Sequence, residues 1–139
     1  RLYICIGRAK KFLCAINCHL FNDIYEKILA DLQSAGNAGE YYTPRAVTQS
    51  MVDILDPQLG ESVLDPACGT GGFLTCTIEH LKKQEKTDKD RAKLQDSIHG
   101  VEKKPLPHML AMTNLMLHGI DVPSNIRHDN TLSRPLKDY

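Results

Sequence analysis

The feature that most constrains the fold is a short strand followed by an acid, a glycine-rich loop and a helix. The segment runs from Ser62 to Leu74 and reads SVLDPACGTGGFL. Its apolar start is typical of a buried strand, Asp65 closes that strand, and Pro66 stops further pairing. Three glycines follow within four positions, and glycine lets a backbone turn sharply and lie close to a bound molecule. The free N–H groups of the next helix suit an anion, so the segment predicts a cofactor-binding loop whose glycines, Gly71 included, serve the ligand more than the fold.

Two other phosphate-binding loops do not fit this segment. A P-loop ends in Gly-Lys-Ser/Thr, and no lysine lies near Gly72. A dinucleotide-binding loop needs a third glycine or alanine for close helix packing, and Leu74 stands at that position.

A second motif, GEYYTPR, covers residues 39–45 and precedes an amphipathic helical pattern. Thr43 is a favourable N-cap and Pro44 suits the first helical position, while Asp56-Pro57 ends the pattern. The apolar positions of this helix are Val47, Met51, Ile54 and Leu55. In the first interpretation, Thr43 only caps the helix and the two tyrosines only belong to the core. In the second, the helix N-terminus attracts an anionic group of a ligand. The two readings are compatible.

The rest of the chain alternates helices with strands. Ser97–Glu102 is expected to be a strand that ends in an acid, and Pro105 opens a second large helix that ends at Gly119. The apolar positions of that helix are Leu106, Met109, Leu110 and Leu117, with Thr113 on the same face. A third strand is expected within Asn125–Leu132, and the charged run from Lys82 to Asp96 reads as a solvated helix end and loop. This order predicts an α/β fold with a parallel sheet and flanking helices.

The two motifs together resemble the modification (M) subunit of type I restriction-modification systems, a family of DNA adenine methyltransferases. That family carries a Gly-Glu-Tyr-Tyr-Thr-Pro-Arg-like motif X just before motif I, Asp-Pro-Ala-Cys-Gly-Thr-Gly-Gly-Phe, and here Arg45 precedes Asp65 by 20 positions. The resemblance runs from about Asn22 to Tyr139 and implies a Rossmann-like fold that binds S-adenosylmethionine. It implies that the methionine end of the cofactor is held by Glu40, Tyr41, Tyr42, Thr43, Pro44 and Arg45. It also places Gly69, Thr70, Gly71 and Gly72 under the cofactor and Asp65 near its amino group.

Two later segments extend the resemblance. An acid at the end of the second strand of a nucleoside-binding sheet can accept hydrogen bonds from ribose hydroxyls, and the family has Gly-x-Glu here, so Glu102 is the expected ribose ligand. The alternative is an acid turned to solvent. Asn125–Leu132 resembles the family's Gly-Asp-Thr/Ser-Leu motif, which would bring Asp129 to the adenine. Here His128 stands in place of the usual glycine, and Asn130 is inserted.

The base-holding motif of the family is missing from the sequence. These enzymes use Asn-Pro-Pro-Phe/Tyr/Trp to accept hydrogen bonds from the target amine and to stack on the flipped base, and no Pro-Pro pair exists in the 139 residues. We therefore expect a fragment that is inactive alone and contains no catalytic residue. Residues 1–20 are left unassigned, and 21–139 are expected to form the cofactor-binding part of the methyltransferase domain.

The charge balance would count against a DNA enzyme that acts alone, and it is tolerable in the resembled systems. Lysine and arginine number 17, as do aspartate and glutamate, so no basic nucleic-acid face is indicated; in the resembled systems DNA is read by a separate specificity subunit, beside a restriction subunit. No apolar span or signal peptide is seen, which predicts a cytoplasmic protein without a membrane. Five cysteines and six histidines show no metal-ligand spacing, so the cysteines are expected to be reduced and no metal is expected.

Two alternatives to the DNA enzyme remain open at this point. One is a non-catalytic cofactor-binding or assembly module. The other is a methyltransferase that acts on protein or RNA, since Asn-Pro-Pro sites also modify amides. Motif X directly before motif I favours the DNA enzyme.

Overall fold

The computed structural model of the protein describes Lys27, residues 43–133 and Pro135. Apart from Lys27, these residues belong to the second of two compact units, Thr43–Tyr139. The expected domain boundary at residue 20 lies outside the described residues. Within the described part of the chain, no helix is long and apolar enough to cross a membrane.

Three short parallel strands form the described sheet, and they confirm the predicted α/β fold. They are β1 (Val63–Asp65), β2 (Ile98–Glu102) and β3 (Ile126–His128), in the order β1-β2-β3. Asp65 stands opposite Gly100 of β2, and Glu102 stands opposite His128 of β3. Because all three strands run in the same direction, their carboxyl ends, with the acids that follow them, meet at one edge of the sheet.

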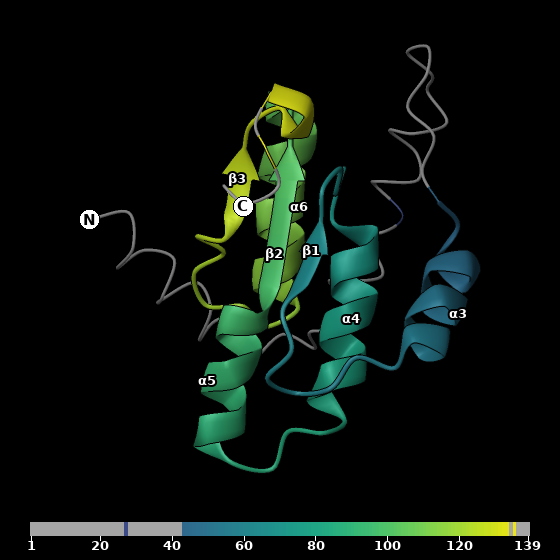
Figure 1. Ribbon diagram of the computed structural model, residues 1–139, viewed down its shortest axis with the longest axis vertical. Coiled ribbons are helices and arrows are strands. Elements are labelled where there is room, and N and C mark those ends of the chain that lie inside the picture. Colours follow the sequence, from purple (N-terminus) through teal and green to yellow (C-terminus); the bar gives the residue numbers. More distant parts are fainter. Residues whose placement is uncertain (1–26, 28–42, 134, 136–139) are drawn as a thin grey trace. The chain divides into compact units, whose positions relative to one another are not determined.

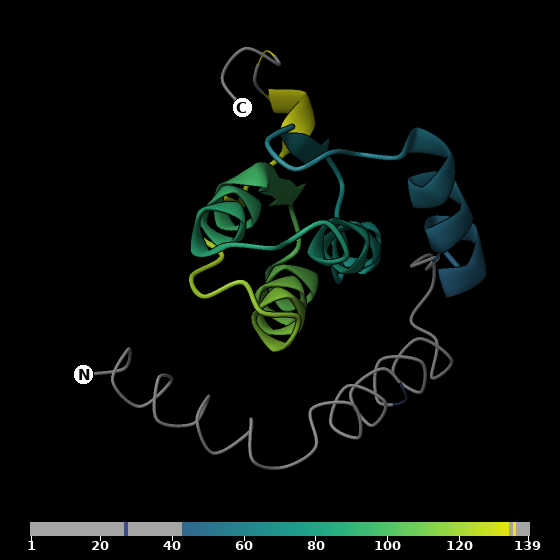
Figure 2. The ribbon, with the colours of Figure 1, turned by 90° about the horizontal axis from the view of Figure 1, so that it is seen from below.

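The crossover helices connect these strands. After β1 come α4 (Gly72–Lys82) and α5 (Asp88–Ser97), and after β2 comes α6 (Pro105–Leu117). Figure 2 shows α4 and α6 on the same side of the sheet, as expected for two right-handed crossovers that advance in the same direction. Helix α3 (Arg45–Leu55) packs beside α4 and precedes β1 (Figure 1).

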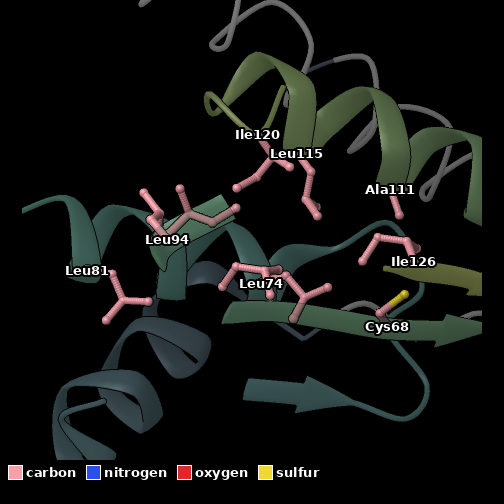
Figure 3. Packing of buried hydrophobic residues seen from close by; sticks show 10 residues of the cluster. Cys68, Leu74, Leu81, Leu94, Ala111, Leu115, Ile120 and Ile126 are labelled. Carbon is pink, nitrogen blue, oxygen red and sulfur yellow. The ribbon is translucent and has the colours of Figure 1, made fainter. Parts of the chain in front are cut away.

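The core lies between the sheet and these helices. Its fully buried side chains come from α4, α5, β2 and α6, among them Leu74, Ile78, Leu94, Ile98 and Leu115. Figure 3 shows Ala111 and Leu115 projecting from α6 towards Leu74 and Cys68. At the centre, a Cβ on Gly100 would lie 3.0 Å from Leu74 Cδ1 and 3.1 Å from Cys68 Sγ, so β2 needs a glycine there.

The helix α3 exists as predicted, but its start and its buried face differ from the prediction. Pro44 is the N-cap, its side chain makes no capping hydrogen bond, and its carbonyl accepts from Val47 N and Thr48 N. The prediction of Thr43 as N-cap and Pro44 as first helical residue is therefore wrong by one position. Asp56 ends the helix as expected, with a left-handed φ of 45°.

The apolar positions used to predict α3 and α6 are exposed or half-buried, and other residues of each helix are buried. In α3 the buried residues are Thr48 and Val52, whereas Ile54 is 82% exposed. In α6 the buried residues are Pro107, Ala111, Asn114 and Leu115, whereas Leu106, Met109 and Thr113 are exposed. Both helices carry apolar residues on more than one side, so periodicity alone could not select the face that meets α4 and the sheet.

The predictions for β1 and for the charged run 82–96 also need correction. Leu64 is 39% exposed, and β1 lies at one edge of the described sheet, so the strand is not fully buried. The run expected to be a helix end and loop contains α5. Thr87 Oγ1 accepts from Asp90 N while the Asp90 carboxylate accepts from Thr87 N, a capping box that starts this helix.

Candidate functional site

The glycine loop turns sharply between β1 and α4. Gly69 has φ 53° and Gly71 has φ 85°, a region that glycine adopts without steric cost. Cys68 N donates to Val101 O, Gly71 N donates to Cys68 O at 2.7 Å, and the first helical hydrogen bond joins Thr75 N to Gly71 O. The first N–H groups of α4 therefore have no acceptor four residues back within the helix, which is the arrangement that binds anions at helix starts.

The three glycines have different surroundings. A Cβ on Gly71 would lie 2.9 Å from Leu115 Cδ1 and 3.5 Å from Ala111 Cβ, so the loop rests directly on α6 at this residue. A Cβ on Gly69 or Gly72 would have no atom within 4 Å. Gly71 therefore has a packing role that the sequence did not indicate, while the open space beside Gly69 and Gly72 suits a bound molecule.

Glu102 reaches from the end of β2 to this loop. Its Oε2 accepts from Gly69 N at 3.0 Å and its Oε1 accepts from Lys104 N at 2.7 Å. The carboxylate is half-buried rather than turned fully to solvent. The acid at the end of the second strand and the glycines after the first strand therefore form one site.

Asp65 faces the same site from the end of β1. Burial raises the pKa of this carboxyl, a hydrogen bond from Ala67 N lowers it, and the charge of Glu102 raises it further. Two carboxylates whose charges repel each other favour a ligand that brings a cation and hydrogen-bond donors between them. An ammonium group and ribose hydroxyls are such partners.

The residues after β3 close the other side of this edge. Asp129 N donates to Glu102 O, and Asn130 N donates to Asp129 Oδ1. Beyond them, Thr131 Oγ1 donates to Pro66 O, which ties the turn after β3 to the loop after β1 across the end of β2. The structure therefore brings Asp65, Gly69, Glu102 and Asp129 to one edge of the sheet.

The described residues of the GEYYTPR motif, Thr43, Pro44 and Arg45, lie at the start of α3. Glu40, Tyr41 and Tyr42 lie outside the described residues. Thr43 and Pro44 are exposed before α3, and Arg45 Nη2 donates to both Glu79 oxygens at 2.7 and 2.8 Å. Glu79 Oε1 also lies 3.3 Å from His118 Nε2, so Arg45 joins α3 to α4 and to the end of α6.

Two residues that support the loop were missed by the sequence analysis. Asn114 Nδ2 donates to Thr70 O at 3.1 Å from within α6, and Thr131 Oγ1 bonds Pro66 O. Both contacts span more than forty residues, so no local spacing pattern could indicate them. Asn114 stands out only as a polar residue one turn after Ala111 in an apolar helix.

Cys68 and Cys76 are buried free thiols. Burial, with the charges of Asp65 and Glu102, raises the pKa of Cys68 to about 12, so this thiol stays protonated. Cys76 Sγ lies 3.3 Å from Thr48 Oγ1, between α4 and α3. Among the described residues, no group of three or more His, Cys, Asp or Glu side chains could hold a metal ion; Cys14 and Cys18 lie outside that part.

Comparison with known proteins matches this chain to one family. The model of the family described as N-6 DNA Methylase matches residues 16–139. The chain is 65% identical over 122 residues to the type I restriction enzyme EcoEI methylase subunit of Escherichia coli, a match that covers 87% of this chain and 25% of that protein. The chain therefore spans about a quarter of the length of this curated relative.

Solved structures of type I enzymes share the fold. A chain in a structure that addresses complex assembly and conformational transition of the type I R-M system has a TM-score of 0.77 and 42% identity, over 85% of this chain and 24% of that one. The EcoKI M protein has a TM-score of 0.60 and 34% identity, over 67% of this chain and 21% of its own. The predicted methyltransferase fold is confirmed, with the glycine loop at the start of its first crossover.

Proposed function

Because this chain belongs to the N-6 DNA methylase family, we propose that it is the S-adenosylmethionine-binding part of a type I DNA adenine methyltransferase subunit. One observation carries the proposal: Asp65, the glycine loop, Glu102 and Asp129 converge at the carboxyl ends of three neighbouring parallel strands. In open α/β sheets, ligands bind outside these strand ends. When bound, S-adenosylmethionine supplies a methyl group activated on a sulfonium.

The residues of the site fit the two polar ends of this cofactor. Glu102, whose oxygens already accept two N–H donors, is a hydrogen-bond acceptor for the ribose hydroxyls. Asp65 attracts the amino group, and Asp129 is the acceptor for the adenine amine. Gly69 and Gly72 leave the space beside the loop free of side chains.

The motif X residues are proposed to hold the methionine end. These are Glu40, Tyr41, Tyr42, Thr43, Pro44 and Arg45. Arg45 already pairs with the Glu79 carboxylate. If its guanidinium also binds the methionine carboxylate, it must contact both carboxylates at once. Thr43 and Pro44, both exposed, are accessible to a ligand without such competition.

Calorimetry with S-adenosylhomocysteine tests the cofactor site on the 139-residue chain. Loss of a charge-assisted hydrogen bond costs about 1.5–3 kcal/mol, so Glu102→Gln should weaken binding roughly tenfold or more. Glu61→Gln is the matched control, because Glu61 precedes β1 at the opposite end of that strand. Failure of the parent protein to bind would refute the cofactor proposal, and equal affinity of Glu102→Gln and the parent would refute the ribose assignment alone.

We further propose that this chain transfers no methyl group by itself, because it contains no Asn-Pro-Pro motif. DNA, the specificity subunit and the restriction subunit are the proposed partners of the complete enzyme. Incubation of the chain with labelled S-adenosylmethionine and adenine-containing DNA tests its activity, with a complete type I methylase as positive control. Label incorporation by the chain alone would overturn the proposed inactivity.

A further inference from the structure

The buried side of the glycine loop is built on one face of α6. Gly71 lies against Leu115 and Ala111, both of them fully buried. Figure 3 shows both side chains directed from α6 towards the core beneath the loop. Between them on the helix, Asn114 is only 4% exposed and donates its Nδ2 to Thr70 O at 3.1 Å.

This hydrogen bond and one other fix a single peptide group. Thr70 C=O and Gly71 N–H belong to the same rigid plane. Asn114 holds the oxygen of that plane, and Cys68 O holds its N–H at 2.7 Å. With both ends fixed, the plane cannot rotate, and the direction in which the chain enters α4 at Gly72 is set.

An asparagine at position 114 is energetically unfavourable if its only role is packing. Its Oδ1 is buried and has no hydrogen-bond partner in the described part of the chain. Exchanging the amide nitrogen and oxygen would put Oδ1 against Thr70 O, two acceptors in contact, so the orientation is dictated by the loop. A leucine of similar size would fill the space without an orphan acceptor, which indicates that the donor of Asn114 is what the site requires.

We propose that Asn114 is a positioning residue for cofactor binding, which acts by holding the Thr70–Gly71 peptide in the orientation that aims the start of α4 at the ligand. The inference rests on the proposed cofactor site, and it adds a residue from α6 that does not contact the ligand. Helix α6 would then orient the glycine loop in addition to packing in the hydrophobic core.

Hydrogen exchange of the ligand-free, full 139-residue chain tests the inference without any cofactor. Asn114→Leu should increase amide exchange in the peptide that covers residues 69–72, relative to the parent. Leu94→Ala is the control, since it opens a cavity at a buried position in α5 and should leave exchange in the loop unchanged at temperatures where both variants remain folded. Unchanged loop exchange in Asn114→Leu would overturn the proposal.

Calorimetry with S-adenosylhomocysteine gives the second readout. Asn114→Leu should weaken binding tenfold or more, while Leu94→Ala should stay within about twofold of the parent. If the parent binds and Asn114→Leu binds equally well, the inference fails and the cofactor site stands. If the parent does not bind, the cofactor site fails, and the exchange experiment still decides whether Asn114 holds the loop.

A conservative variant separates the donor from the volume of the side chain. Asn114→Asp keeps the shape but donates only when its carboxyl is protonated, so its affinity relative to the parent should be low above neutral pH and recover as the pH falls. Asp65, Glu102, Glu79 and His118 are present in both proteins, so the parent measured at each pH is the reference for the variant. A ratio of affinities that does not change with pH would show that cofactor binding does not depend on the hydrogen-bond donor to Thr70 O.

Discussion

At the scale of single residues, neighbouring glycines of one motif have different roles. Gly71 combines a φ of 85° with close contact to α6, whereas Gly72 begins α4 with open space where a Cβ would stand. Both glycines could be assigned to the loop from the sequence. The sequence could not show which of the two faces the core, because the contact of Gly71 is with α6, a helix more than thirty residues later.

Substituting alanine at these two glycines should therefore have opposite effects. Gly71→Ala should cost about 1–3 kcal/mol, from the left-handed backbone and the contact with Leu115, and should lower the thermal midpoint by several degrees. Gly72→Ala should keep or raise that midpoint, because alanine is the better helix residue, yet should reduce the stabilisation by S-adenosylhomocysteine. Thermal unfolding with and without ligand measures both, and an unchanged ligand-induced shift in Gly72→Ala would exclude Gly72 from the binding surface.

Asp65 should reduce the stability of the free protein at neutral pH. Because burial and Glu102 raise its pKa above the ordinary 3.8, the folded state binds the proton more tightly than the unfolded state. Stability is therefore lost as the pH rises from the ordinary pKa through the raised one.

Asp65→Asn keeps the acceptor for Ala67 N and removes the charge. It should be more stable than the parent at pH 7, with the difference shrinking towards pH 4, and it should bind S-adenosylhomocysteine more weakly. Urea unfolding at both pH values measures the first effect. A variant less stable than the parent at pH 7 would contradict the proposed penalty.

At the scale of elements, the order of helices and strands could be read from the sequence because strand ends and helix breaks carry local signals. Asp65, Glu102, Asp56 and Gly119 each mark an end where the structure has one. Helix α5 was missed because ten residues with few apolar positions show no amphipathic pattern, although Thr87 and Asp90 already had capping-box spacing. The buried faces of α3 and α6 could not be chosen, since tertiary contacts decide between two apolar sides.

The capping box of α5 provides a test at this scale. Thr87→Ala removes the side chain that accepts from Asp90 N, and the loss of an N-cap costs about 1 kcal/mol. For a domain of this size we expect the thermal midpoint to fall by roughly 4–8 °C. Affinity for S-adenosylhomocysteine should not change, because the start of α5 lies at the opposite end of the crossover from the strand ends; a loss of affinity at a temperature where the variant is folded would contradict that separation.

At the scale of the whole molecule, the described part of the chain exposes one edge of its sheet and several apolar side chains. Strand β1 pairs with β2 alone among the described strands, and Leu64 on it is 39% exposed. Helix α3 adds exposed apolar side chains, with Ile54 at 82% and Leu55 at 77%. Unpaired strand edges and apolar patches recruit other chains, and proteins usually cover them or place charges on them.

We therefore expect the purified 139-residue chain to self-associate as its concentration rises. Leu64→Lys places a charge on the edge strand, and Ile54→Lys places one on α3. Light scattering over a concentration series should show a rising mean mass for the parent and a smaller rise for the variant whose surface makes the contact. Reduction by Leu64→Lys alone would assign the association to the sheet edge, and reduction by Ile54→Lys alone would assign it to the helix. A parent protein that stays monomeric throughout would show that both surfaces are covered within the chain itself.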